Sequence, residues 1–386
     1  MPPYLAGRKD EEREFLKLLA QDVILENLVL TGLRGVGKTV LVETFKPLAM
    51  GHGWLWVGTD LSETISVSEQ NLAIRIITDI SVVTSAIHFP IGEKQQAGFS
   101  GTTNVLVQTL NYAHLFDLYE RTPGLSSDKL KHVLEYVWSF IKQTDRRGII
   151  FAYDEAQNMA DNAAKEQYPL SVLLDVFQSI QRKGIPFMLA LAGLPTLFPK
   201  LVETRTYAER MFRVVVLAQL DDEDSRDAIL KPIEDSACPV RFNEPSVQVI
   251  VDLSGGYPYF IQFICREVYD IWIQRAQNGD SMSIPIEALT RKLDTDFFAG
   301  RWARATDRQR ELLIVISHLE NANGEFAVQE IVESSHELLV KGFGASHVSQ
   351  MLSSLINSGL IYKNRHGKYS FAVPLMAGFI RRQTAG

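Results

Sequence analysis

The sequence predicts an α/β protein: a core built on a parallel β-sheet, then a helical domain and a C-terminal winged-helix domain. Three observations support this class. Apolar runs of strand length alternate with helical patterns over the first 217 residues, which favours parallel strands joined by helices. The alternation ends near Asp221, and only helical patterns follow. From about Thr306, three helical patterns and two short strands around residues 364–367 indicate a winged helix-turn-helix. We therefore expect domains at 1–217, 218–305 and 306–386.

A glycine-rich motif lies early in the first domain. Residues 32–39, Gly-Leu-Arg-Gly-Val-Gly-Lys-Thr, match the pattern G-x-x-x-x-G-K-[ST] of a phosphate-binding loop (P-loop). A buried-strand pattern precedes the motif at residues 27–31. The helical pattern after it is expected to end at Pro47, because a helix interior disfavours proline. This strand and helix argue against a glycine-rich turn that carries Lys-Thr by chance.

The motif predicts a P-loop NTPase. Glycines let backbone amides converge on phosphate groups, and the helix N-terminus adds positive potential. We expect Lys38 to reach the β- and γ-phosphates as a catalytic cation, and the Thr39 hydroxyl to ligate Mg²⁺. The expected nucleotide-binding residues of the loop are Arg34, Gly35, Val36, Gly37, Lys38, Thr39 and Val40.

The second chemical signal is an apolar run at residues 148–153 that leads into Asp154 and Glu155. Alone, such a run is usually a strand that meets solvent. Downstream of a P-loop, it indicates a Walker B strand that delivers its acids to the sheet edge where ligands of open α/β sheets bind. We expect Asp154 to hold the Mg²⁺ shell and Glu155 to polarise the attacking water as a catalytic residue.

Three arginines, Arg205, Arg210 and Arg213, lie close together before the last expected strand of the first domain, residues 214–217. One interpretation is a solvated basic edge. The other is an arginine supplied in trans to the γ-phosphate of a neighbouring copy. We favour Arg210 for this catalytic role, which implies a homo-oligomer.

The segment from about residue 85 to 127 is the least legible part of the chain. It is polar and glycine-rich at residues 95–103 and shows no regular period. This pattern predicts a loop or a mobile insertion. The segment is either an ordinary surface loop or a site for a partner.

The composition excludes several classes of protein. A formal net charge of −7 means that any nucleic-acid surface must be a local patch. Cys238 and Cys265 are the only cysteines, which fits a reducing cytoplasm and argues against structural zinc or a disulfide framework. The most apolar stretch, residues 185–198, is too short to span a bilayer, and the start of the chain lacks the layout of a signal peptide. We expect a cytoplasmic protein without membrane contact.

Together, these motifs resemble those of AAA-type ATPases, between the origin-recognition-like initiators and the STAND-type signalling ATPases. Leu5-Ala6-Gly7-Arg8 resembles the Gly-Arg box of that family, and Gly256-Tyr257-Pro258 resembles its lid motif. The resemblance implies a helical lid, ATP or ADP as the ligand with Mg²⁺, and ATPase activity. It also implies that Leu5 and Arg8 lie beside the adenine, and that Tyr257 and Pro258 close over base and ribose.

Two departures from the family pattern concern hydrolysis. The sensor-1 position near residues 193–195 has no asparagine, and only Thr196 follows the proline. The lid turn carries Pro258 where many relatives place a sensor arginine, and Arg266 lies about two helical turns further on. Both departures suggest a slow nucleotide switch.

Three classes of function use a P-loop of this kind. The first is a nucleotide-dependent ATPase that binds double-stranded DNA through the winged helix. The alternative is a signalling or defence ATPase whose winged helix is an autoinhibitory module or contacts a protein partner. The third, a metabolic P-loop kinase, leaves lid and winged helix without a role.

The third helix of the winged unit bears on the choice between the first two functions. Its exposed residues can hydrogen-bond base edges but include no cation for phosphate; they are Ser346, His347, Ser349, Gln350, Ser353 and Ser354. Positive charge comes from the wing and from the last helix, at Arg365, His366, Lys368, Arg381 and Arg382.

Overall fold

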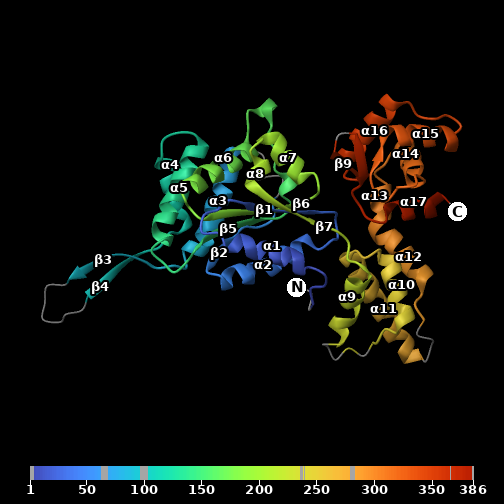
Figure 1. Cartoon of the computed structure of the whole chain (residues 1–386), viewed down its shortest axis with the longest axis horizontal. Helices are drawn as coiled ribbons and strands as arrows, with labels where there is room; N and C mark the ends of the chain where they lie inside the picture. Colours follow the sequence, from blue (N-terminus) through green and yellow to red (C-terminus); the bar gives the residue numbers. More distant parts are fainter. Residues whose placement is uncertain are drawn as a thin grey trace. The chain divides into compact units, whose positions relative to one another are not determined.

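The computed structural model describes residues 4–61, 68–95, 103–234, 238, 240–278, 283–365 and 367–384. The chain divides into two compact units (Figure 1). The first contains Lys9–Thr31 and Lys38–Val216. The second contains Pro2–Arg8, Gly32–Gly37 and Leu217–Gly386.

The first unit is built on a five-stranded parallel sheet with the order β2-β5-β6-β1-β7. The strands are β1 (Asn27–Gly32), β2 (Trp54–Val57), β5 (Gly148–Tyr153), β6 (Phe187–Gly193) and β7 (Phe212–Leu217). Every residue of β1, β5 and β6 is buried, which explains why these strands read as continuous apolar runs. The predicted α/β class with a parallel sheet is confirmed.

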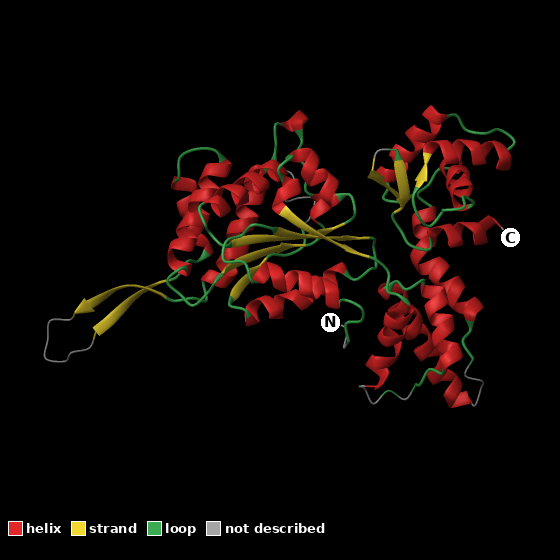
Figure 2. Ribbon diagram, viewed as in Figure 1, coloured by secondary structure: helices red, strands yellow, loops and turns green. Residues whose placement is uncertain are grey.

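Helices cover both faces of this sheet (Figure 2). On one face, α1 and α2 pack together through the stacked rings of Phe15 and Phe45, whose centroids are 4.2 Å apart. On the other face, α3, α5 and α6 join a large apolar core with β5 and β6. The helices of the unit are α1 (Lys9–Leu19), α2 (Lys38–Gly51), α3 (Glu69–Thr84), α4 (Tyr112–Arg121), α5 (Ser126–Ile141), α6 (Pro169–Arg182), α7 (Leu197–Thr204) and α8 (Ala208–Met211).

The predicted end of α2 at Pro47 is wrong, because the helix continues through this residue to Gly51. Proline removes one backbone hydrogen bond from a helix, but here its ring is exposed to solvent. Ala49, in the turn that follows, is completely buried. Burial of that last turn offsets the local cost of the proline.

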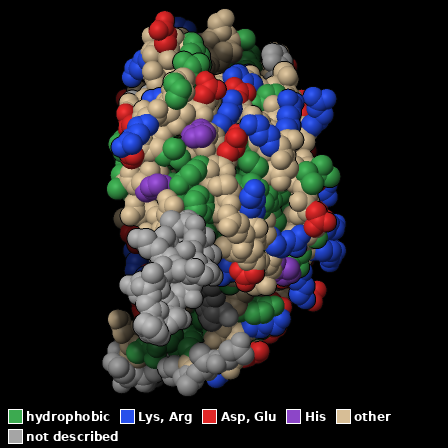
Figure 3. All heavy atoms as spheres, turned by 90° about the vertical axis from the view of Figure 1, so that its left-hand side faces the viewer, with side chains coloured by type: hydrophobic (Ala, Val, Ile, Leu, Met, Phe, Trp, Pro, Cys, Tyr) green, Lys and Arg blue, Asp and Glu red, His purple; other side chains and the backbone are tan. Residues whose placement is uncertain are grey.

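The segment without a sequence period contains a β-hairpin. Strand β3 (Phe89–Gln95) pairs antiparallel with β4 (Thr103–Gln108), and α4 follows. Residues 96–102, part of the stretch expected to be a loop, lie outside the described residues. In Figure 1 the hairpin extends away from the sheet. On the face that carries α4 and α5, Figure 3 shows basic and acidic side chains interspersed, so the coloured part of that face offers no continuous basic surface.

The second unit holds two apolar cores. The first joins the N-terminal arm, through Ala6, to four helices: α9 (Asp222–Glu234), α10 (Glu244–Ser254), α11 (Pro258–Asn278) and α12 (Ile286–Leu293). The second lies among the C-terminal elements. These are the π-helix η4 (Asp294–Ala299), α13 (Gly300–Trp302), α14 (Asp307–Ser317), β8 (Phe326–Ala327), α15 (Val328–Leu338), α16 (Ala345–Asn357), β9 (Ile361–Arg365), β10 (Lys368–Phe371) and α17 (Met376–Thr384).

The C-terminal elements include the three helices and two strands expected of a winged helix. The short strand β8 was not expected, and it completes a three-stranded sheet with the order β8-β10-β9. Within the described ranges, no helix is long and apolar enough to cross a bilayer.

Candidate functional site

The P-loop joins the end of β1 to the start of α2. Gly35 and Gly37 have φ angles of 82° and 94°, a region that glycine enters without steric cost. Gly35 is also confined by space, since a Cβ added there would lie 3.0 Å from Tyr259 Cβ. Lys38 is the first residue of α2, where the backbone amides of the first helical turn have no partner within the helix. The loop therefore has the backbone shape and the helix N-terminus that an anion site needs.

The structure brings the two expected magnesium ligands together. The Thr39 hydroxyl donates to Asp154 Oδ2 at 2.5 Å. The other oxygen of Asp154 accepts the backbone N–H of Glu155 at 2.7 Å, and the Asp154 side chain is buried at the end of β5. A hydroxyl and a carboxylate are hard oxygen donors, which fit Mg²⁺ completed by water and phosphate oxygens. Across the described part of the chain, no cluster of three or more His, Cys, Asp and Glu side chains could hold a metal ion.

Glu155 follows Asp154 in an unusual backbone conformation. Its φ of 51° lies in the left-handed region, which is costly for a residue with a side chain. The side-chain amide of Gln157 donates to the Glu155 carboxylate. The carboxylate is therefore held at the same end of β5 as the Thr39–Asp154 pair.

The N-terminal arm is docked on α9 and on the P-loop backbone. The Tyr4 hydroxyl accepts from Lys231 Nζ at 2.9 Å, and Leu5 is half-buried. Arg8 is buried, and its guanidinium donates to the carbonyl oxygens of Val36 at 3.0 Å and Ala218 at 2.9 Å. Arg8 thus fixes the backbone of the P-loop, whereas a place for Leu5 and Arg8 beside the adenine stays a prediction.

The lid turn has two glycines with positive φ, Gly255 at 57° and Gly256 at 74°. A Cβ on Gly256 would lie 2.3 Å from the Leu220 carbonyl oxygen, so this position requires glycine. The turn leads into Tyr257, whose pKa is raised by burial, and then into Pro258, which begins α11. Their roles at base and ribose stay predictions.

Tyr259 contacts the P-loop, which sequence reasoning missed. Its backbone N–H donates to the Gly35 carbonyl oxygen at 3.1 Å. The bond uses the backbone, so no side-chain motif could have indicated it.

Two of the three arginines form ion pairs within the first unit. Arg205 binds Asp175 through two nitrogens, at 3.0 and 2.8 Å, and lowers the pKa of that carboxyl group. Arg213 binds Glu14, with its closest nitrogen at 2.5 Å. The Arg210 side chain is exposed and, within the described ranges, makes no hydrogen bond or ion pair.

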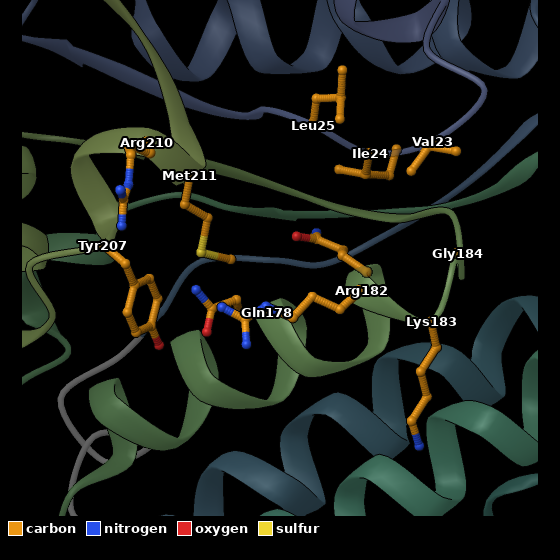
Figure 4. A pocket seen from close by; sticks show the side chains of 11 residues that line it. Val23, Ile24, Leu25, Gln178, Arg182, Lys183, Gly184, Tyr207, Arg210 and Met211 are labelled. Atoms are coloured by element: carbon orange, nitrogen blue, oxygen red, sulfur yellow. The ribbon is translucent and has the colours of Figure 1, made fainter.

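Arg210 lines an open hollow of about 730 Å³ (Figure 4). The wall opposite α8 includes Val23 and Leu25, two exposed apolar residues just before β1. Gly184, just before β6, also lines the hollow, which therefore lies at the amino-terminal edge of the parallel sheet. A six-residue strand such as β1 spans about 20 Å, so Arg210 is far from Thr39 and Asp154 at the opposite edge of the same sheet.

Comparisons with solved structures give the fold. The ADP form of the Aeropyrum pernix ORC2 protein matches with a TM-score of 0.58 and 15% identity, over 100% of this chain and 97% of that chain. The ADPNP-ADP complexes of the same protein match with a TM-score of 0.55 and 13% identity, over 100% and 97%. The Aeropyrum pernix ORC1 protein in complex with DNA matches with a TM-score of 0.50 and 16% identity, over 99% and 94%.

At these identities the likeness establishes the fold alone, and it is the fold of the origin-recognition proteins, as the sequence motifs indicated. A family model described as "Domain of unknown function (DUF8462)" matches residues 295–380. A comparison with curated proteins found no match.

Arg8 offers a test of the braced P-loop. Arg8→Ala removes two hydrogen bonds from a charged donor, each worth about 1.5–3 kcal/mol, and should weaken ATP binding about tenfold or more. Arg8→Lys should recover only part of this loss, because a single ammonium group replaces a planar fork. Titration with a fluorescent ATP analogue measures both variants, with the exposed Arg13→Ala as control. An unchanged Kd for Arg8→Ala would contradict the bracing role.

Proposed function

We propose that this protein is a Mg²⁺-dependent AAA-type ATPase that binds ATP, hydrolyses it slowly and switches between an ATP-bound and an ADP-bound state. The observation that carries the proposal is the contact between Thr39 and Asp154. It joins the first turn of the P-loop helix to the end of β5, as a magnesium–nucleotide site needs. The resemblance of the motifs and the shared fold point the same way.

In this proposal, each residue of the P-loop and of the β5 end has its own role. The loop amides and Lys38 bind the phosphates, while Thr39 and Asp154 hold Mg²⁺. When bound there, Mg²⁺ would supply positive charge that neutralises the phosphates. Glu155 orients and polarises the attacking water, since its carboxylate lies one residue beyond Asp154 at the same strand end.

Slow hydrolysis is supported by what stands at the sensor positions. Thr196 is the N-cap residue of α7, and its side chain makes no capping hydrogen bond. Arg266 is exposed on α11. Neither position supplies the side-chain amide or the buried guanidinium that would stabilise the transition state of hydrolysis. We therefore expect a low rate of hydrolysis, so that the ATP-bound state persists as well as the ADP-bound state.

Assembly into a homo-oligomer is supported by the place of Arg210. Arg210 is unpaired, and the sheet separates it from the P-loop of its own chain. An arginine there can stabilise developing phosphate charge only in a neighbouring copy. Arg205 and Arg213 are less suited to this role, because each already neutralises a carboxylate of its own chain.

Binding of double-stranded DNA is the favoured use of the proposed winged helix. Its side chains Ser346, Ser349, Gln350 and Ser353 are exposed on α16 and can reach base edges. The Aeropyrum pernix ORC1 protein was solved in complex with DNA. That protein, which has the same fold, is a precedent for the proposal.

The alternative, a signalling ATPase with an autoinhibitory or protein-binding winged helix, draws support from the charges. Lys368 is paired with Glu330 at 3.2 Å, and Arg382 with Asp294 of η4 at 2.5 Å. Residues 306–386 contain eight Lys and Arg against seven Asp and Glu. A nearly neutral domain whose cations are partly paired attracts DNA weakly.

The first test concerns the chemistry. Lys38→Ala should abolish ATP binding, whereas Glu155→Gln should retain binding and stop turnover, because only the carboxylate that polarises water is lost. Nucleotide titration and phosphate release measure the two effects. Hydrolysis by Glu155→Gln at the parental rate would refute the catalytic assignment.

The second test concerns assembly. If Arg210 acts in trans, ATPase activity per protomer should rise with protein concentration. Arg210→Ala protein mixed into active protomers should depress their rate, whereas Arg121→Ala, a change at an exposed arginine of α4, should not. Activity that is constant from nanomolar to micromolar protein, with Arg210→Ala at the parental rate, would remove the trans role.

The third test concerns DNA. Four cations, Arg365, Lys368, Arg381 and Arg382, would give a slope of log affinity against log salt near −3 to −4, at about −0.9 per phosphate, and near −2 if Lys368 and Arg382 stay paired. Glu330→Gln frees Lys368 and keeps a side-chain oxygen to cap α15, so it should steepen the slope by about one. Glu337→Gln, the same charge change at an exposed residue of α15, is the control.

One result would favour the signalling alternative over DNA binding. It is the absence of duplex binding at low salt with a non-hydrolysable ATP analogue, together with higher ATPase activity after deletion of residues 306–386.

A further inference from the structure

Gln157 links the carboxylate of Glu155 to the end of strand β6. It lies in the short 3-10 helix η2 (Ala156–Asn158), two residues after Glu155. Its side-chain nitrogen donates to Glu155 Oε2, and its side-chain oxygen accepts the backbone N–H of Leu194 at 3.0 Å. One amide group therefore bridges the ends of two neighbouring strands.

The end of β6 is shaped to receive this amide. A Cβ added to Gly193 would lie 2.5 Å from Gln157 Oε1 and 3.0 Å from Leu197 Cδ2. Gly193 does not have a positive φ, so its backbone does not demand glycine. The missing side chain instead makes room for the amide of Gln157.

The backbone around Gln157 is fixed as well. The Gln157 carbonyl oxygen accepts from Lys200 Nζ at 2.8 Å, and Asn158 Nδ2 donates to the Leu61 carbonyl oxygen at 3.0 Å. Burial lowers the pKa of Lys200, while the carboxylates of Asp161 and Glu203 act in the opposite direction. These contacts hold the turn in which Glu155 keeps its left-handed backbone.

We infer that Gln157 is a positioning residue for Glu155, an inference that rests on the proposed ATPase function. By holding one oxygen of the carboxylate, Gln157 fixes the plane of the group and leaves the other oxygen for the attacking water. The same amide ties this orientation to the end of β6. There the resemblance implies a polar sensor side chain, and this chain has Gly193 and Leu194 instead.

The donor role can be separated from the structural role by an isosteric change. Gln157→Glu still accepts the Leu194 N–H but, when ionised, cannot donate to Glu155. We expect kcat to fall about tenfold or more, as for misplaced catalytic groups, with KM for ATP, the Kd of a non-hydrolysable analogue and the Tm nearly unchanged. Gln157→Ala should lose similar activity, and Gln143→Ala, a change at an exposed glutamine just after α5, should lose none.

The contact with Gly193 gives a second measurement that needs no hydrolysis. Gly193→Ala should lower the Tm of the parental protein, because its methyl group displaces the Gln157 amide. In the Gln157→Ala background the same change should lower the Tm much less, since the clashing oxygen is gone.

The outcomes are distinct. A parental protein without ATPase activity overturns the proposed function. With an active parent, parental kcat in Gln157→Glu overturns the inference, and equal Tm losses from Gly193→Ala in both backgrounds overturn it whatever the activity.

Discussion

The register of three buried parallel strands is the constraint on which the candidate site depends. Thr31 of β1 lies level with Gly193 of β6, and Leu191 of β6 lies level with Tyr153 of β5. The P-loop, the Asp154–Glu155 pair and the β6 end therefore open at one edge of the sheet. A slip of one residue would turn buried side chains to the opposite face and separate Thr39 from Asp154. The apolar core on both faces makes such a slip costly, so packing far from the site fixes its chemistry.

Two residues outside the motif hold the backbone of the P-loop through hydrogen bonds. The Arg8 guanidinium holds the Val36 carbonyl, and the Tyr259 N–H holds the Gly35 carbonyl. Both residues lie far from the motif in sequence, one in the N-terminal arm and one at the start of α11. A loop whose carbonyls are held in this way keeps its amides turned toward a ligand. Within the second unit, the same few hydrogen bonds therefore connect the loop to the N-terminal arm and to the start of α11.

The common direction of the parallel strands also determines at which edge of the sheet the arginines lie. All strands run the same way, so residues before β1, β6 and β7 share the edge opposite the P-loop. Arg210 lies there among apolar side chains that solvent reaches, whereas Arg205 and Arg213 are paired with carboxylates of their own chain. Glu330 and Asp294 likewise pair with Lys368 and Arg382 in the C-terminal elements and reduce the unpaired positive charge there.

The sequence by itself determined the fold class and pointed to the P-loop and the Asp154–Glu155 end of β5. Local signals specify these features: glycines at positive φ, a Lys-Thr pair at a helix start and an apolar run ending in two acids. The end of α2 was misjudged at Pro47, because burial of the following turn outweighs a local propensity. Only the tertiary structure decided which arginine is unpaired, that Arg8 and Tyr259 hold the P-loop, and that Gln157 bridges Glu155 and Leu194. The contacts of Arg8 with Val36, of Tyr259 with Gly35 and of Gln157 with Leu194 join residues far apart in the chain, and a single sequence does not specify which distant groups share a hydrogen bond.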